Sequence, residues 1–166
     1  NHRELYIFSF VRNPWSRLYS TWKNKIANPD KQAPRTIIER FDELHYNMPF
    51  EEFVYFVHSE KFGNDEFGDR HWTSQHLFLR DSDGLLTPNF IGRLENLEED
   101  FDKVISELGL GKVELPWLNT RKGWTSNKES MSSDPKNFYR EHYNDETMKM
   151  VSDRFSEDIE LFGYEF

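Results

Sequence analysis

The 166-residue sequence predicts a single α/β domain that is weighted towards helix. Three observations lead to this fold class. An apolar run of β-forming residues spans 5–11 and gives way at Arg12 to a helical pattern. A second short β-forming run spans 90–94. Apolar residues recur at helical spacing in most of the remaining chain, and a single domain over 1–166 is large enough to bury one core.

The first helix is expected to begin directly after the first strand. Asn13 suits the N-cap, whose side chain accepts a hydrogen bond from the first turn, and Pro14 is tolerated at the first helical position. Trp15, Leu18 and Trp22 then follow at helical spacing and form a face that we expect to pack on the core. The strand therefore passes into the helix with almost no loop between them.

Further helices are predicted from apolar spacing and from capping residues. After a polar connector at 28–35, the pattern becomes helical again. Asn96 and Glu99 have the spacing of a capping box, and Gly109 suits the end of the helix that this box begins. The expected helices span 36–45, 50–58, 97–108, a segment that begins at Asp134-Pro135, and 145–162.

Cationic and hydroxyl side chains gather where the first strand meets its helix. Arg12 ends the strand, and Arg17 and Ser20 lie one turn apart on the helix. Guanidinium groups donate forked hydrogen bonds to phosphate oxygens, and a hydroxyl adds a further contact. Because open α/β sheets bind ligands at the carboxyl ends of their strands, the pattern predicts an anion site. An arginine that merely caps a sheet edge fits the same residues.

These residues resemble the 3′-phosphate-binding element of sulfotransferases that use 3′-phosphoadenosine 5′-phosphosulfate. The matching residues are Arg12-Asn13-Pro14 and Arg17-Leu18-Tyr19-Ser20. Further segments resemble the family in the same order along the chain, and the likeness is closest to its carbohydrate-type branch. They are Asp69-Arg70-His71-Trp72-Thr73-Ser74-Gln75, the segment 89–97, Leu115-Pro116-Trp117-Leu118-Asn119, and the ending from Tyr143 to Tyr164. The resemblance implies that Arg12 and Ser20 hold the 3′-phosphate, with Arg17 in the same cofactor-binding group.

The resemblance further implies a P-loop-NTPase-like sulfotransferase fold, in which a parallel sheet core is flanked by helices. In this family a phosphate-cradling loop well upstream of the Arg-Asn-Pro strand holds the phosphosulfate. Only eleven residues precede Arg12, and Gly109-Leu110-Gly111-Lys112 follows a helix and lacks the P-loop spacing. We therefore expect the carboxyl-terminal two-thirds of a sulfotransferase domain, lacking the N-terminal phosphosulfate-loop unit and unable to catalyse transfer by itself.

His71 lies in one of the matched segments and is the candidate catalytic residue. Sulfuryl transfer needs a base that takes the proton of the acceptor hydroxyl, and the ordinary pKa of histidine suits that task. His71 can instead hold the acceptor loop through hydrogen bonds, and both roles stay open. His71 and His76 are five residues apart, which is not the spacing of a helical zinc site, so we expect no metal cofactor.

A second candidate segment, 119–128, is rich in cations. Members of the family place a flexible cationic loop here that closes over the nucleotide. The resemblance therefore makes Arg121 and Lys122 candidate phosphate contacts, and Ser126 and Lys128 weaker ones. A solvated loop whose Trp124 packs on the body of the domain fits the same residues.

The net charge of −9 looks unsuited to a polyanionic nucleotide, but the charges are unevenly distributed. Residues 1–25 carry five cations against Glu4 alone, a local charge of +4 that attracts anions. The acidic balance argues against a nucleic-acid partner. It also makes a neutral sugar or small alcohol a better acceptor than a heavily sulfated glycan.

The sequence also bears on where the protein is found. It contains no run of about 18 apolar residues, so no membrane span is expected in this chain. It has no Cys, which excludes disulfides and thiolate metal sites, and no Asn-x-Ser/Thr acceptor. Golgi relatives are lumenal, and lumenal proteins usually carry one or both features. We therefore expect a prokaryotic or viral cytoplasmic protein, or a Golgi-lumenal one if the source is eukaryotic.

The expected function is transfer of a sulfuryl group from 3′-phosphoadenosine 5′-phosphosulfate to a hydroxyl of a carbohydrate or small-molecule acceptor. One alternative is a non-catalytic fragment or scaffold that binds the 3′-phosphoadenosine nucleotide. Another is a different phosphoryl-transfer enzyme, such as a nucleotide kinase. A kinase would show a Walker-type Lys and Mg²⁺-binding acids near a strand end, and neither is visible.

Overall fold

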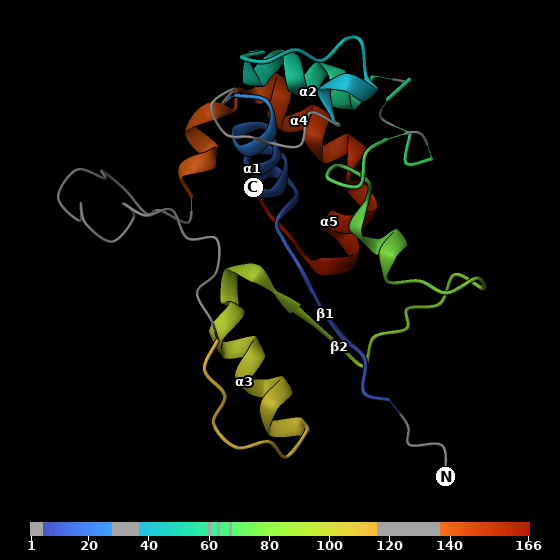
Figure 1. Ribbon diagram of the computed structural model, residues 1–166, viewed down its shortest axis with the longest axis vertical. Helices are drawn as coiled ribbons and strands as arrows, with labels where there is room; N and C mark the ends of the chain where they lie inside the picture. The colour runs from blue at the N-terminus through green and yellow to red at the C-terminus, as the bar shows by residue number, and fades with distance from the viewer. Residues whose placement is uncertain (1–4, 28–36, 60, 63, 67, 116–136) are drawn as a thin grey trace, which may run out of the picture.

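The structure is a computed structural model that describes residues 5–27, 37–59, 61–62, 64–66, 68–115 and 137–166. Within these residues, a body of four helices lies at one end of a two-stranded sheet, and one further helix lies along the side of the sheet (Figure 1). The α/β class expected from the sequence is confirmed at this level, with a small parallel sheet and helices around it.

The sheet pairs two short strands that are far apart in the sequence. β1 (Phe8–Val11) and β2 (Phe90–Arg93) run parallel, with Phe8 opposite Phe90 and Val11 opposite Arg93. Gly92 is opposite Phe10, and a Cβ on this glycine would lie 2.5 Å from a carbon of the Phe10 ring. Any larger residue at this position would force the Phe10 ring to shift.

The helix after β1 begins where the sequence predicts. α1 (Pro14–Lys25) has Asn13 as its N-cap, and the Asn13 side chain accepts a hydrogen bond from the backbone N–H of Ser16. Trp15 and Leu18 are buried, so the expected core-facing side of the helix is confirmed. The strand-to-helix junction at Arg12 is therefore held on both sides by regular structure.

Aromatic side chains fill the core between α1 and the rest of the helical body. α2 (Phe50–His58) buries the apolar face that its spacing predicts, including Phe53 and Val57. Trp72 is fully buried and packs edge-to-face on Phe53, with ring centroids 5.7 Å apart. The buried ring of Trp72 therefore anchors the segment that carries the candidate base to the core.

The prediction of a helix at 36–45 is wrong. Among its described residues, only a single 3₁₀ turn, η1 (Ile38–Arg40), is helical, and Phe41 has an extended backbone. Phe41 and Leu44 are nevertheless buried, and Phe41 contacts the rings of Phe62 and Trp72. The apolar residues therefore reach the core from an irregular segment, and their helix-like spacing reflects that burial instead of a helix.

Helix α3 (Leu97–Glu107) follows β2 through a 3₁₀ turn, η3 (Leu94–Asn96). The expected capping box is wrong, because Asn96 makes no side-chain hydrogen bond to the helix. The buried carboxylate of Asp100, in the first turn, accepts a hydrogen bond from the backbone N–H of Arg93 instead. Gly109 follows the helix with a φ of +62°, which confirms its expected role at the end of the helix.

The final helix expected at 145–162 is two helices. α4 (Asp145–Arg154) and α5 (Ser156–Phe162) meet at Phe155, whose φ of −114° and ψ of 27° interrupt the helical path. Phe155 is buried, and the break lets Asp158 reach the interior with no exposed surface. A further 3₁₀ helix, η4 (Phe138–His142), precedes α4, while the expected helix start at Asp134 lies outside the described residues.

Candidate active site

A shallow, open hollow of about 390 Å³ lies at the carboxyl end of β1. It is lined by the three predicted cofactor-binding residues of the strand-to-helix junction, by the predicted base, and by three further residues. The lining residues are Arg12, Arg17, Ser20, Thr21, Arg70, His71 and Phe78. The structure thus brings the candidates from both matched segments to one place, whereas Arg121 and Lys122 lie outside the described residues.

Arg12 leaves β1 at its carboxyl end and turns its side chain towards the hollow. Its Nε and Nη2 donate to the Oγ of Ser16 at 3.0 and 2.8 Å, which fixes one side of the guanidinium group. Burial lowers the pKa of Arg12, and Glu95 opposes that shift. Among the described residues, Arg12 has no carboxylate within ion-pair distance, so its charge is available to an anion.

Arg17 lies one turn further along α1 and holds the segment that carries His71. Its Nη1 donates to the carbonyl oxygen of Thr73 at 2.7 Å, and its Nη2 donates to that of Arg70 at 2.9 Å. Burial lowers the pKa of Arg17 to about 10, against the opposing effect of Asp158 and Asp65. The group stays protonated at neutral pH, so Arg17 both adds positive charge and joins the two halves of the site.

Two hydroxyl groups follow Arg17 on α1. The Oγ of Ser20 accepts a hydrogen bond from the Asn24 amide at 3.3 Å and keeps its own proton for another acceptor. The hydroxyl of Thr21 donates to the carbonyl oxygen of Arg17 at 3.1 Å. Of the two, Ser20 has the hydroxyl suited to donate to a ligand.

His71 is oriented by a carboxylate two residues earlier in the chain. The Oδ1 of Asp69 contacts the Nδ1 of His71 and also accepts its backbone N–H at 3.0 Å. Burial raises the pKa of Asp69, but these hydrogen bonds and the charge of Arg40, 3.7 Å away, outweigh burial and hold the pKa below its usual value. An ionised Asp69 fixes the proton of His71 on Nδ1 and leaves Nε2 as the acceptor.

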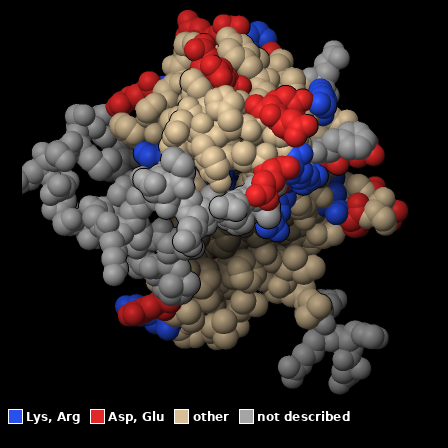
Figure 2. Space-filling model, turned by 45° about the horizontal axis from the view of Figure 1, so that its top comes forward, with Lys and Arg blue, Asp and Glu red and all other residues tan. Residues whose placement is uncertain are grey.

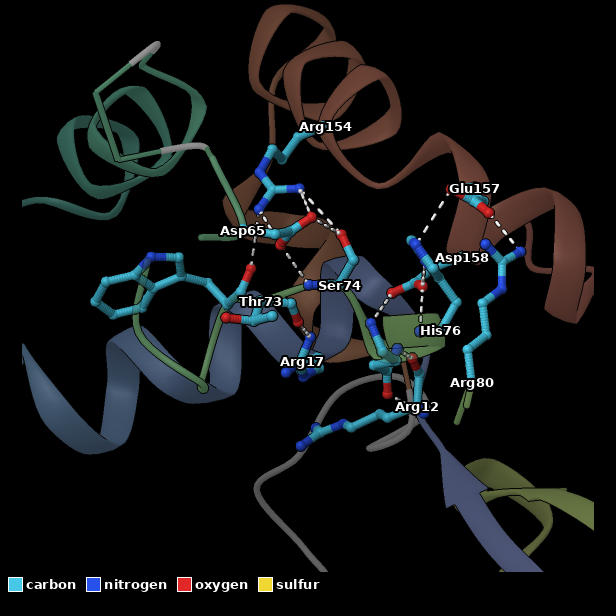
Figure 3. A network of polar contacts seen from close by, with 12 residues as sticks. Arg12, Arg17, Asp65, Thr73, Ser74, His76, Arg80, Arg154, Glu157 and Asp158 are labelled. Atoms are coloured by element: carbon cyan, nitrogen blue, oxygen red, sulfur yellow. Dashed lines mark hydrogen bonds and ion pairs between the residues drawn. The ribbon is translucent and has the colours of Figure 1, made fainter. Parts of the chain in front are cut away.

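An ion pair between Asp65 and Arg154 anchors the segment that carries His71, through Ser74 (Figure 3). Asp65 accepts from both the backbone N–H and the hydroxyl of Ser74, at 2.7 and 2.8 Å. Arg154 of α4 donates to Asp65 at 2.6 Å and also reaches the Ser74 hydroxyl. These contacts tie the segment 69–74 to the helical body.

Gln75 joins the two matched segments directly. Its Oε1 accepts the backbone N–H of Arg12 at 2.9 Å, and its Nε2 donates to the carbonyl oxygen of Arg12 at 2.8 Å. The fully buried Asp158 of α5 accepts the backbone N–H groups of Gln75 and His76, at 2.7 and 2.8 Å. It also contacts the Nδ1 of His76 at 2.7 Å, while Glu157 bridges the other ring nitrogen to Arg80.

Several residues that hold this site were not predicted from the sequence, and three of them are central to its geometry. Asp69 and Gln75 lie in the segment that resembles the family, and Asp158 lies in the terminal segment, but no role was expected for any of them. The signal for Asp69 was its place two residues before a candidate base. Nothing in the local sequence indicates the partners of Gln75 and Asp158, which lie 63 and 83 positions away.

The described surface supports local binding of an anion, with no broad basic face in view. On the face shown in Figure 2, a compact group of Lys and Arg side chains adjoins acidic ones, and large uncharged areas surround both. No helix in the part of the chain that the structure describes is long and apolar enough to cross a membrane. Within the same residues, no group of three or more His, Asp or Glu side chains is arranged to hold a metal ion.

The sequence matches the sulfotransferase family over residues 1–165. The chain belongs to the sulfotransferase family. Comparisons with curated proteins and with solved structures gave no match. Membership of the sulfotransferase family implies sulfuryl transfer from a phosphosulfate-type donor to a hydroxyl-bearing acceptor, and it confirms the resemblance on which the site was predicted.

Proposed function

We propose that this sulfotransferase transfers a sulfuryl group from 3′-phosphoadenosine 5′-phosphosulfate to a hydroxyl of a carbohydrate or small-molecule acceptor. One observation carries the proposal: a single hollow is lined by Arg12, Arg17 and Ser20 on one side and by His71 on the other. Two segments about 50 residues apart in the sequence thus supply the side chains that would bind the nucleotide and the candidate base. The proposal also assigns the domain to the P-loop-like sulfotransferase fold.

In this proposal, Arg12 and Ser20 bind the 3′-phosphate of the donor. The guanidinium group of Arg12 is partly buried and keeps N–H groups beyond the two that contact Ser16. Hydrogen bonds between ionised partners are shorter and stronger than neutral ones, and reduced contact with water strengthens them further. Arg17 adds positive charge to the same hollow while its own N–H groups hold the backbone at Arg70 and Thr73.

His71 acts on the acceptor side. The acceptor hydroxyl oxygen attacks sulfur, a new O–S bond forms, and the bond between sulfur and the bridging phosphate oxygen breaks. The hydroxyl proton passes to the Nε2 of His71, and adenosine 3′,5′-bisphosphate leaves with the electron pair. Asp69 contributes by holding the other ring nitrogen, so that the lone pair of Nε2 faces the acceptor and the imidazolium that forms is stabilised.

The remaining lining residues suit an acceptor with a flat, partly apolar face. Phe78 is 60% exposed although it lines the hollow, so its ring is available to a sugar or another small molecule. In this proposal, Arg121 and Lys122 make further contacts with the nucleotide phosphates; both lie outside the described residues.

The proposal is tested with the full-length protein by following label from ³⁵S-labelled 3′-phosphoadenosine 5′-phosphosulfate into a panel of neutral sugars and alcohols, with one heavily sulfated glycan included. We expect label in at least one hydroxyl acceptor and release of one adenosine 3′,5′-bisphosphate for each transfer. Tight binding of the nucleotide without transfer to any acceptor would favour the non-catalytic alternative. Transfer of phosphate from ATP to the same acceptors would favour a kinase.

A further inference from the structure

Gln75 makes an unusual contact at the anion site, because its side chain pairs with a backbone instead of with a ligand or another side chain. Val11 is the last residue of β1 that has a partner on β2. The backbone N–H and C=O of the next residue, Arg12, are taken up by the amide of Gln75, at 2.9 and 2.8 Å. The side chain of Gln75 thus replaces a neighbouring strand for one residue.

Asp158 holds Gln75 in that position. Its two carboxylate oxygens accept the backbone N–H groups of Gln75 and His76, at 2.7 and 2.8 Å, where the 3₁₀ helix η2 (Gln75–Phe78) begins. Asp158 has no exposed surface, and the ring of His76 contacts it as well. A buried carboxylate that accepts several hydrogen bonds is held firmly in place, because moving it would leave buried polar groups unsatisfied at a cost in free energy.

We infer that Gln75, held by Asp158, is a positioning residue of the anion site: it fixes the backbone of Arg12 and thereby the direction of the Arg12 guanidinium group. Neither residue lines the hollow. Without the two hydrogen bonds from the Gln75 amide, Arg12 keeps its charge, but its backbone lacks partners at the point where the strand has ended and the helix has not yet begun. This inference rests on the proposed binding of a 3′-phosphate by Arg12.

The chain offers a matched control at the other end of β1. The Oδ1 of Asn89 accepts the backbone N–H of Ile7 at 2.8 Å, so a side-chain amide contacts the strand there too. Asn89 lies at the amino end of the strands, away from the hollow. Asn89→Ala therefore removes a comparable contact to β1 without affecting the position of Arg12.

The test measures by calorimetry the dissociation constant of adenosine 5′-phosphate and divides it by that of adenosine 3′,5′-bisphosphate, so that the ratio reports the contribution of the 3′-phosphate alone. Gln75→Met keeps the length of the side chain but loses both hydrogen bonds, and we expect it to lower the ratio about tenfold, equal to about 1.4 kcal/mol. Gln75→Asn, one methylene shorter, is the second variant if the first does not fold. Asn89→Ala should leave the ratio unchanged.

Amide hydrogen exchange provides an independent readout. In a folded Gln75 variant, the amide of Arg12 should exchange faster, while that of Ile26, which donates to the carbonyl oxygen of Trp22 at 2.8 Å, keeps its protection. An unchanged nucleotide ratio in the Gln75 variants would overturn the inference, and so would an equal loss in Asn89→Ala. If the unaltered protein does not distinguish the two nucleotides, the proposed function fails instead, so the two failures are separate.

Discussion

Replacing Arg12 by alanine is the sharpest perturbation of the proposed nucleotide site. The structure shows a half-buried guanidinium group that is fixed by Ser16 on one side and has no described carboxylate partner. A hydrogen bond between charged partners in such a setting contributes about 1.5–3 kcal/mol. Because each 1.4 kcal/mol is about a factor of ten, Arg12→Ala should weaken binding of adenosine 3′,5′-bisphosphate about ten- to a hundredfold.

The assay is isothermal calorimetry with nucleotides that carry or lack the 3′-phosphate. Arg12→Lys keeps the charge but not the fork of donors, so we expect it to recover part of the loss. Lys149→Ala is the control for net charge, because it removes one exposed cation, paired with Asp153, far along the chain on α4. Equal affinity of the Arg12→Ala protein and the unaltered protein for the 3′-phosphorylated nucleotide would refute the assignment.

Three further predictions concern the candidate base His71, the packing at Gly92 and the ion pair of Asp65 with Arg154. In the full-length protein, His71→Ala should lower turnover by about a hundredfold or more and leave nucleotide affinity nearly unchanged, as steady-state kinetics and calorimetry would show. Turnover like that of the unaltered protein would exclude His71 as the base. Gly92→Ala should lower the free energy of unfolding by about 1–3 kcal/mol in urea titrations, because its Cβ meets the Phe10 ring, and an unchanged midpoint would contradict that packing. Burial raises the pKa of Asp65, but hydrogen bonds from Arg154 and Ser74 outweigh burial and hold the pKa below its usual value. The ionised carboxylate therefore stabilises the fold above about pH 4, and this stabilisation is lost as the pH falls through the lower pKa of the folded state. Asp65→Asn should therefore lose less stability than the unaltered protein on acidification below that pH, and parallel pH profiles would contradict the assignment.

The parts of the site that depend on neighbouring residues were predictable from the sequence. Asn13 and Pro14 mark the start of α1 through local capping chemistry, and the structure confirms that start. Arg12, Arg17 and Ser20 lie within nine residues, so a strand followed by a helix is sufficient to bring them to one place. The resemblance to the family then added His71, whose approach to the same hollow depends on long-range packing.

The parts that depend on distant partners were not predictable. Gln75 acts on a backbone 63 positions earlier, and Asp158 acts on a turn 83 positions earlier, so neither role has a local sequence pattern. The break at Phe155 lacks a Pro or Gly signal, and it follows from burying Phe155 and Asp158 against different neighbours. Phe41 shows the converse error, because burial alone produced a spacing that resembles a helix.

A crystal structure of the protein with adenosine 3′,5′-bisphosphate would show whether Arg12 and Ser20 bind the 3′-phosphate in the hollow where His71 faces the acceptor. We expect the 3′-phosphate within hydrogen-bond distance of the Arg12 guanidinium group and the Ser20 hydroxyl, with the Nε2 of His71 facing the open side of the same hollow. A nucleotide bound elsewhere, or bound here with its 3′-phosphate turned away from Arg12 and Ser20, would show that these residues do not form the 3′-phosphate site.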